Sequence, residues 1–149
     1  MFDKVLIANR GAIACRILRT LKALGTTGVA VYSEADAASR HLIEADEAHS
    51  LGEGAAAQTY LAVDKLLAIA LERGVGAIHP GYGFLSENAA FAERCEAAGI
   101  AFIGPTPEQL RVFGLKHTAR ALAKTHGVPM LEGTGLLASV DEALAAAAT

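Results

Sequence analysis

Short apolar runs alternate with amphipathic helical patterns through most of this 149-residue chain, and this alternation limits its fold more than any other feature. An apolar run bounded by turn residues predicts a strand, and a helical pattern after it predicts the crossover of a βαβ unit. The predicted strands are 5–8, 29–32, 77–78 and 101–103, with a weaker one at 48–51. The sequence therefore predicts an α/β fold, a Rossmann-like three-layer domain with a parallel sheet.

Three helical patterns supply the layers that should cover this sheet. The first follows Gly11, the second begins at Val63, and the third spans 89–98. In the first two, apolar residues recur at the spacing of one helix face. These stripes consist of Ile13, Ile17, Leu21 and Leu24, and of Val63, Leu66, Leu67, Ala70 and Leu71.

Capping signals predict shorter helices toward the C-terminus. In Thr106-Pro107-Glu108-Gln109, an N-cap threonine precedes a proline at the first helical position, with glutamine three residues after the cap. Gly114 interrupts that helix, and a second one is expected over 115–125. Ser139 to Glu142 forms another capping box. The alanine-rich helix that it begins reaches Thr149 without a stop signal, so we expect the chain to be cut from a longer protein.

The best candidate for a flexible link is Gly133-Thr134-Gly135. We therefore place the Rossmann-like domain at 1–132, and a linker with the start of a further region at 133–149. One domain is the expectation for a chain of this length, in which 52% of the residues are hydrophobic.

The loop from His79 to Asn88, with the sequence HPGYGFLSEN, is the strongest candidate for a binding site. It follows the predicted strand 77–78, and ligands of open parallel sheets bind at the carboxyl ends of strands. Its glycines allow close approach of a ligand, and Pro80 fixes one backbone angle. We expect Ser86 to cap the following helix, with Glu87 in its first turn. An ordinary βα turn explains the same residues, and both interpretations stay open at this point.

Two further positions are candidates for ligand contact. The turn after the first predicted strand begins with Asn9 and Arg10, which either contact a ligand or only form the turn with the arginine in solvent. It is not a G-x-G-x-x-G fingerprint, and no Walker P-loop occurs in the sequence. Lys116 is expected in the first turn of its helix, where a cation opposes the helix dipole. A phosphate there would gather the lysine and the free N–H groups on one anion, whereas the alternative is an exposed surface lysine.

Composition argues against several classes of function. The formal net charge is −3 and the 13 basic residues are spread along the chain, which disfavours nucleic-acid binding. No segment has the pattern of a signal peptide or the length of a membrane span, so we expect a cytoplasmic protein that does not bind membranes.

Cysteines and histidines do not indicate a metal or hydrolase site. Cys15 and Cys95 are isolated and are expected to be small buried hydrophobes. The five histidines share no metal-ligand spacing, and no Ser-His-Asp or Cys-His arrangement has a supporting motif. We interpret His79 as a structural residue at a strand end.

Three segments together resemble a known family. The HPGYGFLSEN loop, the stretch Lys4 to Gly11 (KVLIANRG) and the stretch Phe102 to Pro105 (FIGP) are similar to motifs of the biotin carboxylase family, in the same order and spacing. The resemblance covers essentially the whole chain and is to the N-terminal domain of these ATP-grasp enzymes, the pre-ATP-grasp domain of biotin-dependent carboxylases.

This resemblance implies a reaction and site residues. Such enzymes use ATP to phosphorylate bicarbonate, and the carboxyphosphate supplies the carboxyl group transferred to N1 of biotin. Gly114-Leu115-Lys116 matches the position of an ATP-contacting lysine, so the resemblance assigns Lys116 to ATP binding. It assigns Tyr82 and Gly83 to the binding of biotin or the carboxyl acceptor. The lid lysine, the Mg-binding glutamates and the catalytic arginine of the family would lie beyond Thr149, so the chain alone is expected to be inactive, with no catalytic or metal-binding residue of its own.

The resemblance also implies partners and a branch. The partners are bicarbonate, a biotin carboxyl carrier domain, and downstream ATP-grasp and carboxyltransferase domains, and a homodimer of the parent is among the options. Ala12 and Leu115 stand where many relatives have acidic residues, and they are similar to the urea carboxylase branch, the ligase part of urea amidolyase. The alternatives are the biotin carboxylase component of an acyl-CoA or pyruvate carboxylase, another ATP-grasp ligase, and a non-catalytic Rossmann-like assembly module.

Overall fold

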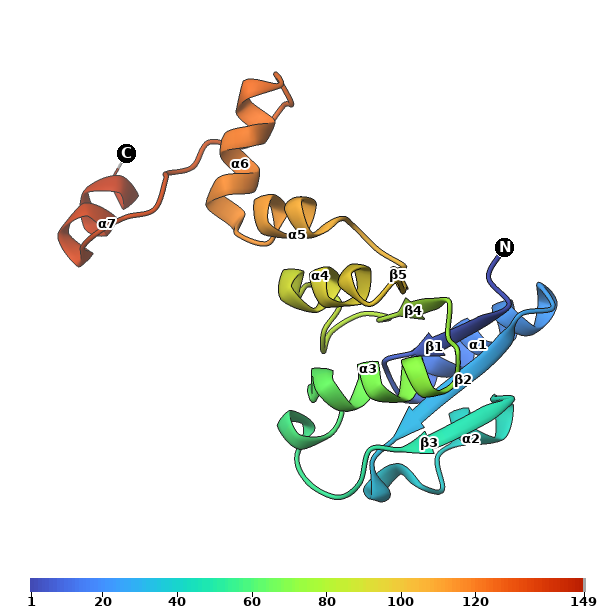
Figure 1. The fold of residues 1–149 in the computed structure, drawn as a ribbon. Helices are drawn as coiled ribbons and strands as arrows, with labels where there is room; N and C mark the ends of the chain where they lie inside the picture. Colours follow the sequence, from blue (N-terminus) through green and yellow to red (C-terminus); the bar gives the residue numbers. More distant parts are fainter. Residues whose placement is uncertain (149) are drawn as a thin grey trace. The chain divides into compact units, whose positions relative to one another are not determined.

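Five parallel strands form one sheet in the computed structural model, which describes residues 1–148 (Figure 1). The predicted parallel sheet is confirmed, because every neighbouring pair of strands is parallel and each strand overlaps its predicted range. The strands are β1 Lys4–Ile7, β2 Thr27–Tyr32, β3 Glu47–Ser50, β4 Ala77–His79 and β5 Ala101–Phe102.

The strand order β3-β2-β1-β4-β5 places a topological switch point next to β1. From β1 the chain passes to β2 and β3 on one side, and then returns to β4 and β5 on the other. The connections after β1 and after β4 run to opposite sides of the sheet. Where two neighbouring strands have such diverging connections, a crevice opens at their carboxyl ends.

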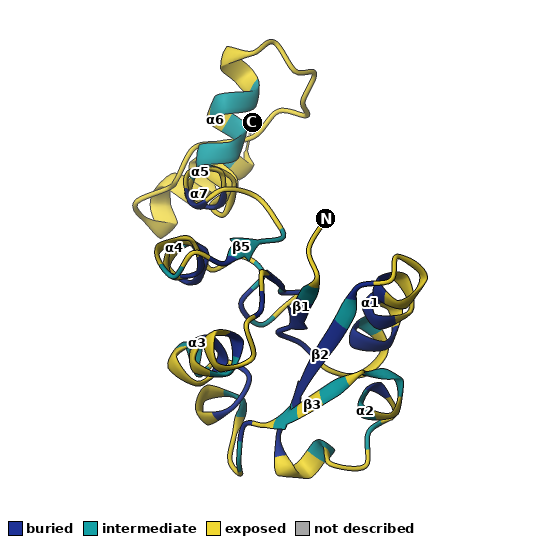
Figure 2. Ribbon diagram, turned by 45° about the vertical axis from the view of Figure 1, so that its right-hand side comes forward, coloured by how far each residue is buried: buried dark blue, intermediate teal, exposed yellow. Residues whose placement is uncertain are grey.

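Helices cover both faces of the sheet, which confirms the three-layer prediction (Figure 2). α1 Gly11–Ala23 and α2 Arg40–Glu44 lie on one face, and α3 Val63–Glu72 and α4 Ala89–Ala97 lie on the other. Two short 3-10 helices, η1 Glu34–Asp36 and η2 Ala56–Gln58, lie in the connections beside β3. The sequence patterns predict α1, α3 and α4, whereas α2, η1 and η2 are too short to show a periodic stripe.

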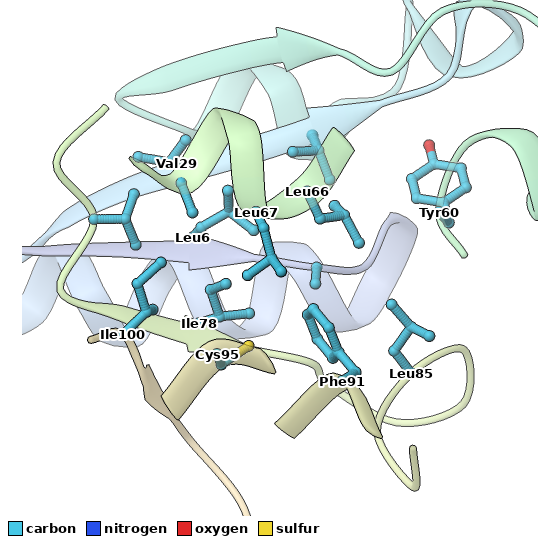
Figure 3. Close-up of a cluster of buried hydrophobic side chains, with 14 of the residues drawn as sticks. Leu6, Val29, Tyr60, Leu66, Leu67, Ile78, Leu85, Phe91, Cys95 and Ile100 are labelled. Atoms are coloured by element: carbon cyan, nitrogen blue, oxygen red, sulfur yellow. The ribbon is translucent and has the colours of Figure 1, made fainter. Parts of the chain in front are cut away.

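A hydrophobic core fills each side of the sheet. Between the sheet and α3 with α4, the core includes Leu6, Val29, Leu66, Ile78 and Phe91 (Figure 3). Between the sheet and α1, it consists of Val5, Ile7, Ala14, Ile17, Leu18, Leu21 and Ala77. Since β1 is buried on both faces, its sequence is a continuous apolar run instead of an alternating one.

The predicted burial of individual side chains is confirmed except at helix ends. Both cysteines are free and buried, Cys95 against the core of Figure 3. Leu24 and Leu71 belong to the predicted stripes but are 53% and 58% exposed. Leu24 is the C-cap of α1, and Leu71 lies in the last turn of α3, so neither side chain is held over the centre of the sheet.

Residues from Arg111 onward form a second compact unit, and the first unit ends at Leu110. α5 Pro107–Phe113 spans this division, and α6 Lys116–Thr125 and α7 Val140–Ala147 follow. The predicted capping box at Thr106 is present: Thr106 Oγ1 accepts from the Gln109 N–H at 3.2 Å, and Gln109 Oε1 accepts from the Thr106 N–H at 2.9 Å. The second box is half formed, because Ser139 Oγ accepts from the Glu142 N–H at 3.2 Å, whereas the Glu142 carboxylate accepts from the Ala138 N–H and not from that of Ser139. The predicted division after residue 132 stays a prediction.

No helix in residues 1–148 combines the length and the apolar character needed to cross a membrane.

Candidate functional site

The ends of β1 and β4 meet at the switch point and line one pocket. The pocket has a volume of about 370 Å³. Its lining comes from two segments that are about seventy residues apart in the sequence: Asn9, Arg10, Gly11, Ala12 and Ile13 after β1, and Tyr82, Gly83 and Phe84 after β4. Two regions that the sequence identified separately, the Asn9-Arg10-Gly11 turn and the HPGYGFLSEN loop, therefore form one site.

The Tyr82–Gly83 turn faces outward at this pocket. The Tyr82 side chain is 70% exposed, and Gly83 is also exposed. Gly83 has a φ of +68°, a backbone conformation that glycine adopts without strain, and a Cβ built there would meet no atom within 4 Å. The turn is thus accessible to a small molecule, and the binding role of Tyr82 and Gly83 stays a prediction.

The Asn9 side chain holds the Tyr82–Gly83 turn through hydrogen bonds. This side chain is buried, and Nδ2 donates to the carbonyl oxygens of Pro80 and Tyr82 at 2.8 and 2.9 Å. Its Oδ1 accepts from the Arg10 N–H at 2.9 Å. The end of β1 is therefore tied to the backbone of the turn that follows β4.

The start of α1 also borders the pocket. Gly11, with a φ of +61°, is its first residue, so the chain turns sharply from β1 into the helix. The N-cap residue, Arg10, makes no side-chain cap hydrogen bond, and the first turn contains no acidic residue. The first N–H groups of a helix have no partners within the helix, so this edge of the pocket favours a polar or anionic ligand group.

Arg10 has a third role that the sequence did not indicate. Its Nη1 donates to both carboxylate oxygens of Asp36, at 2.9 and 3.2 Å. The guanidinium carbon lies 5.4 Å from the centre of the Tyr60 ring and 5.9 Å from that of Phe84. The arginine is therefore an ion-paired and stacked side chain beside the turn, and it is still half exposed to solvent.

Asp36 and Tyr60 complete this cluster, and the sequence analysis missed both. Tyr60 donates its hydroxyl to Asp36 at 2.7 Å and accepts the Ser33 N–H at 3.0 Å. Asp36 lies in η1 and Tyr60 follows η2, two segments without a predicted element. The one available signal was an acidic residue shortly after the carboxyl end of the second predicted strand.

The hydrogen bonds of this cluster favour the ionised form of Asp36. Burial alone would raise the pKa of the carboxyl group, but hydrogen bonds from Tyr60, Arg10 and Ser33 outweigh it, and the pKa lies below its ordinary value. The pKa of Tyr60 is raised, first by burial and then by its bond to Asp36, so the hydroxyl stays a donor. The cluster is thus a fixed ion pair at neutral pH.

Phe84 shows that the turn is constrained by its surroundings. It is the one non-glycine residue with a positive φ, 43°, in the described part of the chain. A conformation of this kind costs about 1–3 kcal/mol and persists only where packing enforces it. Here the Phe84 ring stacks on Tyr60 with centroids 5.1 Å apart and lies under the Arg10 guanidinium.

His79 is a structural residue, as the sequence predicted. Its Nδ1 accepts from the Gly81 N–H at 3.0 Å, which requires an unprotonated nitrogen. Burial lowers its pKa, in agreement with a neutral ring.

The predicted N-cap of α4 was wrong. α4 begins at Ala89, and its cap is Asn88, whose side chain accepts from the Phe91 N–H at 2.9 Å. Ser86 instead lies in a turn in which its N–H bonds to the Gly83 carbonyl, so the loop closes before the helix starts.

Lys116 belongs to the second unit and is the first residue of α6, as predicted. Its side chain is exposed, the N-cap Leu115 provides no side-chain cap, and the first turn contains no acidic residue. No acidic residue in that turn neutralises the lysine, so the N-terminus of α6 favours an anion. Its binding role also stays a prediction.

Residues 1–148 contain no group of three or more histidine, cysteine or acidic side chains placed to hold a metal ion.

Comparison with known proteins gives one consistent family. Residues 1–110 match the family described as "Biotin carboxylase, N-terminal domain". The chain is 52% identical to urea amidolyase of Lachancea kluyveri over 95% of its own length and 8% of that protein. It is 53% identical to biotin carboxylase of Halalkalibacterium halodurans over 97% of its length and 32% of that protein.

A solved structure agrees with these matches. The biotin carboxylase of Campylobacter jejuni, in a structure described as a "Biotin Carboxylase-beta-gamma-ATP Complex", has a TM-score of 0.94 and 40% identity to this chain. The match covers 99% of this chain and 33% of that one. The chain thus spans a third or less of these three proteins.

Proposed function

This chain belongs to the biotin carboxylase family as its N-terminal domain, and from that premise we propose that it forms one wall of the site where a longer parent protein carboxylates biotin with ATP and bicarbonate. The observation that carries the proposal is the pocket at the β1/β4 switch point, with the exposed Tyr82–Gly83 turn on its rim. The turn would receive biotin there, because its backbone and the Tyr82 ring are open to a small molecule.

Lys116 would bind the nucleotide. It is exposed at the N-terminus of α6, where a lysine and free helix N–H groups favour a phosphate. We propose that the Mg-binding and catalytic residues belong to other parts of the parent, since this chain spans 8 to 33% of the relatives compared above. The carrier and carboxyltransferase domains would be its partners.

For the branch, we propose urea carboxylase, the ligase part of urea amidolyase. The support is the resemblance of this sequence to that branch at Ala12 and Leu115. The identities of 52% to a urea amidolyase and 53% to a biotin carboxylase do not distinguish the branches, so the proposed branch depends on these two residues. Carboxylation of urea by the parent, in preference to acetyl-CoA or pyruvate, is the test; carboxylation of either of the others in preference to urea would reject the branch.

The experiment that tests the main proposal is bicarbonate-dependent ATP hydrolysis with free biotin. We expect turnover by the parent and none by residues 1–149 alone. In the parent, Tyr82→Ala should raise the KM for biotin without changing that for ATP. A parent that neither hydrolyses ATP nor is protected from heat denaturation by ATP or biotin would favour a non-catalytic assembly module. Substantial turnover by the 149-residue chain would refute its predicted inactivity.

A further inference from the structure

Within residues 1–148, Asn9 is the one side chain that hydrogen-bonds from the end of β1 to the backbone of the turn after β4. β1 and β4 are paired up to Ile7 and His79, and the Ala8 N–H extends the pairing to the His79 carbonyl at 2.9 Å. Immediately beyond this last backbone bond, the Asn9 side chain continues the connection to Pro80 and Tyr82. The two strands separate here to form the pocket, so Asn9 sets how far apart their ends lie.

The bonds of Asn9 require a carboxamide. Nδ2 has two hydrogens and uses both on carbonyl oxygens, while Oδ1 accepts from the Arg10 N–H. Among side chains of this length only an amide provides two donors and an acceptor together, because an ionised aspartate has no donor and a serine has one. A carboxylate at this position would place an oxygen where Nδ2 now lies, 2.8 and 2.9 Å from two other oxygens.

Gly81 lets Asn9 approach the turn closely. It has a φ of +67°, and a Cβ built on it would lie 2.8 Å from Asn9 Nδ2. The side chain therefore packs directly against the backbone of the turn, and its own atoms are only 4% exposed. With both donors already used, Asn9 has none left to offer a ligand in the pocket.

We propose that Asn9 is a positioning residue, which fixes the Tyr82–Gly83 turn in the conformation that takes biotin. This inference rests on the proposed function. Asn9 acts through the Tyr82 carbonyl, so its loss affects the binding of biotin and leaves the binding of ATP largely intact, since the predicted ATP-binding residue Lys116 belongs to the second unit.

The test measures biotin carboxylation by the parent protein carrying Asn9→Asp. We expect kcat/KM for free biotin to fall about tenfold or more, the effect of one or two lost hydrogen bonds and an added repulsion, while the KM for ATP changes less than about twofold. Asn9→Ser is the second variant, because it removes the bridge without burying a charge and so covers the case in which the aspartate prevents folding.

Asn88→Asp is the matched control. It is the same chemical change in the loop that Asn9 holds, but Asn88 does not line the pocket. Its side chain is exposed and accepts from the Phe91 N–H as the N-cap of α4, a role that aspartate fills equally well. Both KM values should be unchanged in this variant. Two outcomes would overturn the proposal. One is that kcat/KM for biotin and the KM for ATP are impaired by equal factors in both Asn9 variants, and the other is an unchanged kcat/KM for biotin in either folded variant.

A measurement on the 149-residue chain separates failure of this inference from failure of the proposed function. If the wild-type parent does not carboxylate biotin, the proposed function fails regardless of Asn9. The amide NMR signals of Tyr82 and Gly83 should then still shift or broaden in Asn9→Ser and stay in place in Asn88→Asp. Signals that do not move in Asn9→Ser would show that Asn9 does not position the turn.

Discussion

The aromatic rings of Tyr60 and Phe84 stack with centroids 5.1 Å apart and an interplanar angle of 13°, which joins the loop after η2 to the turn at the pocket. The Tyr60 hydroxyl bonds to Asp36, and Asp36 holds Arg10 over both rings. The candidate site therefore has a support that reaches from the end of β2 to the end of β4, in addition to Asn9.

Tyr60→Phe should destabilise the chain while keeping the ring stack. It removes the donor to Asp36 and the acceptor for the buried Ser33 N–H, which we expect to lower the free energy of unfolding by about 1–3 kcal/mol. Tyr60→Leu should cost at least about 0.5–1.5 kcal/mol more, because the stack is also lost. Urea denaturation followed by circular dichroism measures both.

The control for this prediction is Tyr32→Phe, since the Tyr32 hydroxyl makes no hydrogen bond within the described residues and the ring is half-buried. Its unfolding free energy should stay within about 0.5 kcal/mol of the wild type. Equal stability of Tyr60→Phe and the wild type would contradict a supporting role for the hydroxyl.

Gly81→Ala should be more destabilising than Gly83→Ala, although the two glycines have nearly the same backbone conformation. Their φ angles are +67° and +68°, so alanine suffers the same left-handed strain, about 1–2 kcal/mol, at either position. At Gly81 the new Cβ would also lie 2.8 Å from Asn9 Nδ2 and 3.2 Å from Ile13 Cγ1, whereas at Gly83 it meets nothing within 4 Å.

We expect the free energy of unfolding of Gly81→Ala to be about 1–3 kcal/mol lower than that of Gly83→Ala, which is the usual cost of overpacking. Urea denaturation of the two variants side by side measures this difference. Each variant is the control for the other, because the backbone strain from the positive φ is the same in both and cancels in the comparison. Equal destabilisation would mean that Asn9 moves away from the turn at little cost.

The sequence predicted the elements that are long enough to have a periodic stripe or that begin with a capping box. It also located the turn at Tyr82 and Gly83, because glycine and proline determine local backbone geometry wherever they occur. It did not reveal the contacts of Asn9 with Tyr82, of Arg10 with Asp36 and of Asp36 with Tyr60, which join residues 24 to 73 positions apart. Such contacts depend on the strand order, and a single sequence does not determine whether β4 pairs with β1 or with β3.

The difference between Ser86 and Asn88 as the cap of α4 has the same origin. Both residue types are good N-caps, so local preference does not choose between them. The choice depends on where the HPGYGFLSEN loop ends, and this is determined by the packing of Phe84 and Leu85 against the core on the α3 and α4 side. Tertiary packing therefore decided a boundary that local sequence left open.

Lowering the pH from 7.5 to 5.5 should destabilise the chain through His79. Burial places its folded pKa below the ordinary value of 6.5, and the unfolded state therefore binds a proton more readily. The stabilisation is complete above pH 6.5 and is lost as the pH falls toward the folded pKa, because protonation of Nδ1 breaks its bond from the Gly81 N–H.

His79→Asn tests this dependence, because the amide oxygen provides an acceptor near the position of Nδ1 and does not titrate. Between pH 5.5 and 7.5, the unfolding free energy of His79→Asn should depend less steeply on pH than that of the wild type. The difference between the two slopes should stay below about 1.4 kcal/mol per pH unit, the value for uptake of one full proton on unfolding. All other titratable groups are common to the two proteins, so their contributions cancel in the comparison. An identical slope in the two proteins would exclude His79 as its source.

Lys116→Ala in the parent protein should raise the KM for ATP about tenfold or more, because a hydrogen bond between two charged groups contributes about 1.5–3 kcal/mol. Lys116 is the first residue of α6, where its charge opposes the helix dipole unless an anion is bound. Lys124→Ala is the control, since Lys124 is an exposed lysine in the last turn of the same helix, where the dipole favours a cation without any ligand. Removing Lys116 should also stabilise the chain slightly in the absence of ATP, whereas removing Lys124 should not. A KM for ATP that is unchanged by Lys116→Ala, or raised equally by both substitutions, would remove Lys116 from the nucleotide site.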